Sequence, residues 1–175
     1  MSKNEPAIQM NGIAKSFGKK SVLTSIDGSI EQGKAIGLLG ENGSGKTTLF
    51  RILLDALIPE RGEFLILGKP PDGTGAIRNQ IGYIPERPAF HLFMKAGEVL
   101  NFRSKLYNKW NFEFAAASAN RLKLDLNTKV SAASKGTLAK LAWICATAPM
   151  QRGYLSHSAS LFRIFRFRSS NPHCA

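Results

Sequence analysis

The chain runs out of acidic residues well before its C-terminus. No Asp or Glu occurs after Asp125, whereas residues 126–175 carry seven Lys and Arg. This absence excludes a pair of Mg²⁺-binding carboxylates from the last third of the chain, because Mg²⁺ sites in proteins rely on such groups. More than half of the formal net charge of +12 also lies in that stretch. Nucleic-acid binding, which a basic chain suggests, would therefore depend mainly on these residues.

Cysteine and long apolar runs are scarce too. Cys145 and Cys174 are far apart and match no metal-binding or disulfide pattern, which suits a reducing compartment. No apolar run approaches the ~18 residues that a membrane span requires, and residues 1–6 lack the apolar core of a signal peptide. The 175 residues, of which 43% are hydrophobic, suffice for one folded domain with a core.

The most specific pattern lies at residues 40–47, which read Gly-x-x-x-x-Gly-Lys-Thr and match the phosphate-binding P-loop. An apolar run at 35–39 precedes it, as in a buried strand. Residues 48–57 follow with helical apolar spacing, and Pro59 closes the helix. The loop should therefore lead into a helix N-terminus, where unpaired N–H groups and the helix dipole favour an anion. The alternative is a glycine-rich turn with a chance Lys-Thr pair.

Each residue type in this loop has a physical reason. Glycines allow a positive φ and let the backbone approach the phosphates closely. Lys46 supplies positive charge for the β- and γ-phosphates, and the Thr47 hydroxyl is a ligand for Mg²⁺. The predicted nucleotide-binding residues of the loop and the helix start are Gly40, Glu41, Asn42, Gly43, Ser44, Gly45, Lys46, Thr47 and Thr48.

The order of the predicted elements indicates an α/β fold. Strands are predicted at residues 7–10, 13–18, 22–30, 35–39, 63–67 and 81–84. Helices are predicted at residues 48–57, 77–80, 96–107, 113–124 and 138–148. The apolar positions that we expect to be mostly core in the third and fourth helices are Val99, Phe102, Leu106, Phe114, Ala117, Leu122 and Leu124.

Three further motifs, together with the order of the predicted elements, resemble those of a known protein family. Phe17 lies in Lys-Ser-Phe-Gly, Glu86 ends the run Ile-Gly-Tyr-Ile-Pro-Glu, and Ser134 and Gly136 lie in Ala-Ser-Lys-Gly-Thr before the last helix. With these motifs, residues 5–149 resemble the nucleotide-binding module of ATP-binding-cassette (ABC) transporters. The resemblance implies a P-loop NTPase core with an antiparallel β front and a helical subdomain, in which the sheet of this chain is incomplete.

The resemblance also implies a role for each of these residues. Phe17 would stack on the adenine of ATP, and Glu86, where the family usually has Gln, would lie near Mg²⁺ together with Thr47. Ser134 and Gly136 would contact the γ-phosphate of ATP held by an opposite subunit. Considered without the family, Phe17 is a core aromatic, Glu86 a solvated turn carboxylate, and Ser134 a plain helix cap.

The resemblance stops at Pro149. The family continues with a strand ending in Asp-Glu and then a switch histidine; the pair is absent here and we identify no such histidine. We therefore expect a chain truncated or frame-shifted before these residues, and we assign no catalytic residue. The predicted organisation is a P-loop core with its β front at 1–89, a helical subdomain at 90–149 and a disordered, aberrant basic tail at 150–175. A membrane-surface or nucleic-acid-binding strip is the alternative for that tail.

The predicted function is that of an ATP-binding subunit of an ABC transporter, which binds Mg-ATP and in which hydrolysis, implied by the family, is expected to be lost. Whether the chain is an enzyme is left open. The resemblance implies a transmembrane partner subunit, a dimer of nucleotide-binding subunits, and a place at the cytoplasmic face of the membrane. One alternative is a non-catalytic or regulatory ATP-binding remnant. Another is a nucleic-acid-linked P-loop ATPase, although we expect no nucleic-acid partner.

Overall fold

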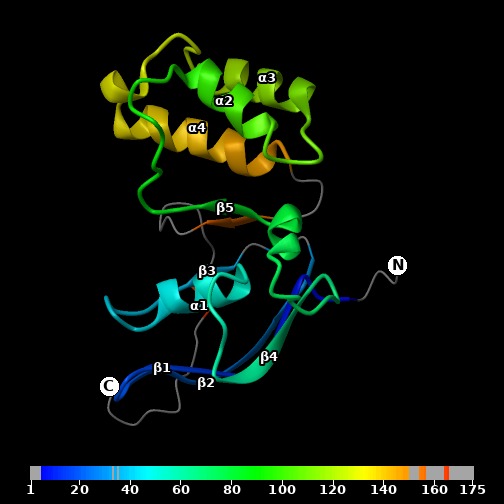
Figure 1. Ribbon diagram of the computed structural model, residues 1–175. Coiled ribbons are helices and arrows are strands. Elements are labelled where there is room, and N and C mark those ends of the chain that lie inside the picture. The colour runs from blue at the N-terminus through cyan, green and yellow to red at the C-terminus, as the bar shows by residue number, and fades with distance from the viewer. Residues whose placement is uncertain (1–4, 33, 35, 150–153, 157–163, 166–175) are drawn as a thin grey trace. The chain divides into compact units, whose positions relative to one another are not determined.

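The computed structural model describes residues 5–32, 34, 36–149, 154–156 and 164–165 (Figure 1). The chain divides into two compact units, Met1–Arg78 with Ala159–Ala175 and Asn79–Ser158. Strand β5 (Gly82–Ile84) belongs with the helices of the second unit, because Ile84 packs against Ala142 and Ala146. The division after residue 89 that the sequence suggests stays a prediction.

An antiparallel sheet of three strands, in the order β2-β1-β4, forms the base of the first unit. The strands span Ile8–Phe17 (β1), Lys20–Ile30 (β2) and Arg61–Ile66 (β4). β1 takes the place of the two strands predicted at 7–10 and 13–18. Its pairing is irregular after Met10, beside Gly12 with a φ of 62°, and such a bulge keeps the strand continuous. The buried side chains of the sheet are Ile8, Met10, Ile13, Ala14, Leu23, Phe64 and Ile66.

The P-loop helix α1 spans Lys46–Leu53 and follows the short strand β3, Gly37–Leu38. The sequence predicted this helix to continue to residue 57. It ends earlier because Asp55 has a φ of 52°, which is incompatible with a right-handed helix. A 3-10 helix, η1 (Ala76–Gln80), matches the short helix predicted at 77–80. The buried side chains of α1 are Leu49, Ile52 and Leu53.

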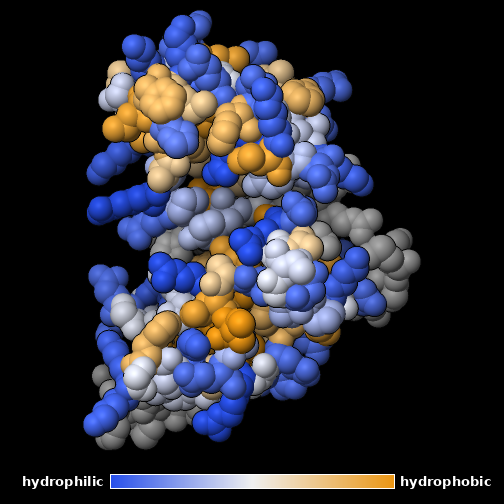
Figure 2. Space-filling view, viewed as in Figure 1, coloured by the Kyte–Doolittle hydropathy of each residue, from blue (hydrophilic) through white to orange (hydrophobic). Residues whose placement is uncertain are grey.

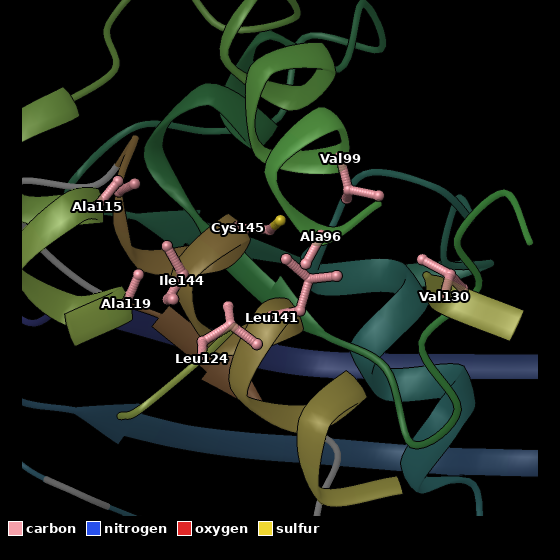
Figure 3. Close-up of a cluster of buried hydrophobic side chains, with 10 residues drawn as sticks. Ala96, Val99, Ala115, Ala119, Leu124, Val130, Leu141, Ile144 and Cys145 are labelled. Atoms are coloured by element: carbon pink, nitrogen blue, oxygen red, sulfur yellow. The ribbon is translucent and has the colours of Figure 1, made fainter. Parts of the chain in front are cut away.

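The second unit consists of helices around an apolar core and a two-stranded parallel sheet. The helices are α2 (Ala96–Ser104), α3 (Phe112–Arg121) and α4 (Lys135–Thr147), with the 3-10 helix η2 (Val130–Ala132) before α4. Figure 3 shows side chains of α2, α3 and α4 directed toward one another. The buried members of this core are Ala96, Val99, Ala115, Ala119, Leu124, Val130, Leu141, Ile144, Cys145 and Ala148.

The apolar positions predicted for this core divide into two groups. Those that are buried or half-buried are Val99, Leu122 and Leu124, as predicted. Those that are exposed, against the prediction, are Phe102, Leu106, Phe114 and Ala117. The buried face of α3 is formed instead by Ala115, Ser118 and Ala119. Small side chains allow the backbones of neighbouring helices to approach closely, so this face packs well without large residues.

Within residues 150–175 the structure describes two short strands. β6 (Tyr154–Ser156) pairs in parallel with β5, and β7 (Ile164–Phe165) pairs in parallel with β3. These five residues depart from the predicted disordered tail, and the remainder of the tail lies outside the described residues. Among the described residues the sheets have three, two and two strands, and the incomplete sheet stays a prediction. In the described part of the chain, no helix is both long and apolar enough to cross a membrane.

Candidate nucleotide-binding site

The predicted P-loop connects β3 to the first turn of α1 in the first unit. Gly45 is the N-cap residue, with a φ of 91°, and as a glycine it supplies no side-chain cap to α1. The N–H groups of a first helical turn have no earlier turn to bond to. Together with the helix dipole, they make this end of α1 favourable for an anion such as a phosphate.

The glycines of the loop differ in what a side chain would meet, and only Gly45 combines a positive φ with close contacts. A Cβ at Gly45 would lie 2.7 Å from Leu23 Cδ2 and 3.0 Å from the Val22 carbonyl oxygen, so β2 packs directly against the helix start. A Cβ at Gly40 would lie 2.6 Å from Ser44 Oγ. A Cβ at Gly43, where φ is 86°, would have no atom within 4 Å, so the requirement for glycine there is conformational alone.

Lys46 folds back over the loop that precedes it. Its ammonium donates hydrogen bonds to the carbonyl oxygens of Gly40 and Glu41, both at 2.6 Å, and to Ser44 Oγ at 3.3 Å. Ser44 N–H donates to the Glu41 carbonyl oxygen at 3.2 Å, which closes the turn. The loop therefore holds its single positive charge next to the helix N-terminus.

The remaining predicted residues of the loop and the helix start differ in exposure. Glu41, Asn42 and Thr47 are exposed, and Thr48, in the first turn of α1, is half-buried. The structure thus brings residues 40–48 together in the arrangement that the sequence predicted. Their contact with a nucleotide remains a prediction.

Phe17, the predicted base-stacking residue, ends β1 and is 50% exposed. It is therefore not the core aromatic of the alternative interpretation. The ammonium of Lys15 lies 5.7 Å from the centroid of the Phe17 ring. The sequence analysis gave Lys15 no role. Its position two residues before Phe17 was the one signal for this contact, because residues two apart on a strand share a face.

The other predicted site residues belong to the second unit. Ser134 is the N-cap of α4: its Oγ accepts a hydrogen bond from Thr137 N–H at 3.1 Å and lies 2.9 Å from Thr137 Oγ1. Gly136 lies in the first turn of this helix. Glu86 follows β5 and is exposed. Ser134 therefore caps a helix, as the alternative interpretation without the family expects. Its contact with a γ-phosphate stays a prediction.

A metal ion at this site would have few protein ligands. Among the described residues, no group of three or more His, Cys, Asp and Glu side chains is placed to hold one. Mg²⁺ fits such a site, because it keeps several waters and takes one or two protein ligands together with phosphate oxygens. The Thr47 hydroxyl, in the first turn of α1 next to the loop, is a suitable donor of this kind.

Among the described residues, the thiol of Cys145 has a pKa that burial shifts strongly. Desolvation raises the pKa of Cys145 to about 12, and the positive charge and hydrogen bond of Arg103 oppose this only in part. Because the thiolate is the reactive form of cysteine, this residue is a core residue of α4 without nucleophilic function at neutral pH.

The loop, its lysine and the helix N-terminus have the arrangement of a P-loop. A family profile described as ABC transporter matches residues 23–152. Over 133 residues the chain is 30% identical to "ABC transporter G family member 20" of Dictyostelium discoideum, covering 75% of this chain and 18% of that protein. The chain belongs to the ABC transporter family.

Further similarities agree with this assignment. The chain is 38% identical over 87 residues to "Nod factor export ATP-binding protein I" of Bradyrhizobium diazoefficiens, covering 49% of this chain. It spans 28% of the length of that relative. A solved structure titled "Structure of ATP binding subunit of ABC transporter" superposes with a TM-score of 0.72 at 21% identity, covering 86% of this chain and 78% of the other. At that identity the superposition supports the P-loop NTPase fold.

Proposed function

We propose that this chain binds Mg-ATP through residues 40–48 and serves as the ATP-binding subunit of an ABC transporter. The observation that carries the proposal is the position of the Lys46 ammonium, held by the carbonyl oxygens of Gly40 and Glu41 beside the start of α1. Family membership supports ATP as the nucleotide, and a relative is named as an export ATP-binding protein.

The chain's own groups bind and orient the phosphates in this proposal. Three N–H bonds of the ammonium are directed to the loop, and the longest, 3.3 Å to Ser44 Oγ, is the one that a phosphate oxygen most readily replaces. Charge-assisted bonds to phosphate are stronger than the bond to a neutral hydroxyl that they replace. The amides at the helix start complete the anion site. The Thr47 hydroxyl would be a ligand of Mg²⁺, which neutralises phosphate charge when bound.

Phe17 supplies the contact to the base. Half of this side chain is exposed at the end of β1, and β2, which pairs with β1, packs against Gly45 of the P-loop. The phosphate loop and the aromatic ring are thus fixed to the same sheet. Stacking on an exposed aromatic ring tolerates many bases, so Phe17 contributes affinity more than base selectivity.

We further propose that this chain by itself turns over ATP poorly, if at all. P-loop hydrolysis depends on positioning and charge, and the attacking water needs a group that orients it. No Asp or Glu follows Asp125 in this sequence, and the family likeness gives Glu86 a place near the metal, not at the attacking water. Binding without turnover is therefore the expected behaviour, which is also what the regulatory alternative predicts.

The proposed partners are a transmembrane subunit and a second nucleotide-binding chain, at the cytoplasmic face of the membrane. Large apolar side chains are exposed on the second unit, among them Leu92 (66% exposed), Phe93 (76%) and Leu106 (56%). Figure 2 shows apolar side chains among charged ones on the visible face of the helices. Exposed apolar groups of this kind support contact with another protein. Ser134 and Gly136 would face the nucleotide of the second chain.

Equilibrium binding tests this proposal. The full chain and its Lys46→Ala variant are titrated with Mg-ATP in a calorimeter, and phosphate release is then followed in the same samples. We expect binding that Lys46→Ala greatly weakens, and no sustained release above the variant. Equal affinity of the two chains would contradict the proposed site.

A further inference from the structure

We infer that Lys15 positions Phe17 for the nucleotide base by covering one face of the aromatic ring, so that the base stacks on the other face. The inference rests on the proposed nucleotide binding and adds a residue that neither the sequence motifs nor the family likeness singles out. Its starting point is the 5.7 Å distance between Lys15 Nζ and the centroid of the Phe17 ring. A cation within about 6 Å of a ring centroid is attracted to the negative face of the ring.

The strand places these two side chains on one face. Lys15 and Phe17 are two residues apart on β1, and side chains at that spacing point to the same side of a sheet. In the pairing with β2, Lys15 lies opposite Leu23 and Phe17 lies opposite Lys20. The pairing with β2 shifts its register between Lys15 and Ser16, so the closeness of the ammonium to the ring rests on the 5.7 Å contact itself.

The exposure of Phe17 and Lys15 agrees with a ring that has one face covered by the lysine and the other face open. Phe17 is 50% exposed, and Lys15 is half-buried. Phe17 also ends its strand next to the turn formed by Gly18 and Lys19. The Lys15 contact restrains the ring at this position, and an ordered ring loses less side-chain entropy when a base stacks on it.

The same hairpin is in contact with the phosphate loop. Leu23, the pairing partner of Lys15, is 4% exposed. Its Cδ2 atom lies only 2.7 Å from where a Cβ of Gly45 would be, so it packs directly against the N-cap of α1. The hairpin that carries Lys15 and Phe17 therefore also contacts the phosphate loop, through the buried Leu23.

This arrangement predicts a base-specific effect. Removing the ammonium should weaken binding of a ligand that has a base and leave a ligand without a base unaffected. A lysine that contacted the phosphates would instead affect both ligands. Cation–π contacts at exposed sites are weak, and the expected loss is about two- to fivefold in affinity.

The test compares three variants of the full chain, Lys15→Met, Lys15→Arg and the control Lys19→Met. Lys15→Met keeps an apolar stem without the charge, Lys15→Arg keeps a cation that favours aromatic faces, and Lys19→Met removes the same charge from the turn of the same hairpin. Dissociation constants are measured for Mg-ATP and for Mg-tripolyphosphate, which has no base. Circular dichroism and melting temperatures confirm that each variant folds as the parent does.

We expect Lys15→Met to weaken Mg-ATP binding about two- to fivefold and tripolyphosphate binding not at all, with Lys15→Arg close to the parent. In a Phe17→Ala background, Lys15→Met should have no further effect, because the ring on which it acts is gone. Equal losses for both ligands, the same loss in Lys19→Met, or no loss in Lys15→Met would overturn the role of Lys15. If the parent binds ATP and Lys46→Ala does not, these results overturn this inference alone; if the parent does not bind ATP, the proposed function fails with it.

Discussion

The contact between Gly45 and β2 leads to a quantitative prediction about the P-loop. Replacing Gly45 by Ala adds a Cβ 2.7 Å from Leu23 Cδ2 and 3.0 Å from the Val22 carbonyl oxygen, at a φ of 91°. The left-handed backbone costs an L-residue about 1–2 kcal/mol, and overpacking a tight contact costs about 1–3 kcal/mol more. Gly45→Ala should therefore lower the unfolding free energy by about 2–5 kcal/mol.

Gly43→Ala is the matched control. Gly43 has a similar φ of 86°, but a Cβ there would have no atom within 4 Å, so only the backbone cost of about 1–2 kcal/mol applies. Urea unfolding of both variants, followed by circular dichroism without nucleotide, gives the two free energies. The difference between them measures the packing of the helix start against β2. Equal losses in the two variants would refute the close contact at Gly45.

Three further predictions concern the base contact, pH and turnover. Stacking contributes about 1–3 kcal/mol per base, so Phe17→Ala should raise the dissociation constant for ATP about tenfold; an unchanged constant would exclude the stacking role. Burial raises the pKa of Cys145 to about 12, so above pH 9 the unfolded chain loses this proton while the folded chain keeps it. The unfolding free energy should then fall with pH across that window more steeply in the parent than in Cys145→Ala, and identical slopes in urea titrations would count against a buried thiol. Purified chain should release no phosphate beyond the Lys46→Ala background, and sustained release would show that a carboxylate outside our assignment orients the water.

The P-loop could be predicted because local chemistry determines it. Glycines at positions that need a positive φ, a lysine and a helix start act within a few residues of each other, so Gly43, Gly45 and Lys46 carry the information in their spacing. The same holds for Ser134, whose cap on α4 joins residues three apart.

Features that depend on tertiary contacts could not be predicted in this way. On α3 the large Phe114 suggested the core face, but Ala115 and Ala119 are buried because their small side chains allow close packing. The end of α1 was placed by Pro59, whereas the left-handed backbone at Asp55 ends it earlier. The contact of Lys15 with Phe17 could be predicted only after both residues were known to lie on one strand, because the two-residue spacing places them on one face only there.

The central claim, that residues 40–48 bind Mg-ATP, is tested most directly by calorimetric titration of three chains. The parent should bind Mg-ATP at one site per chain, and Lys46→Ala should bind far more weakly, because the loop loses the ammonium that its carbonyl oxygens hold in place. Lys69→Ala, which removes an exposed lysine just after β4, should bind as the parent does. Affinity in Lys46→Ala that equals the affinity of Lys69→Ala would contradict the account.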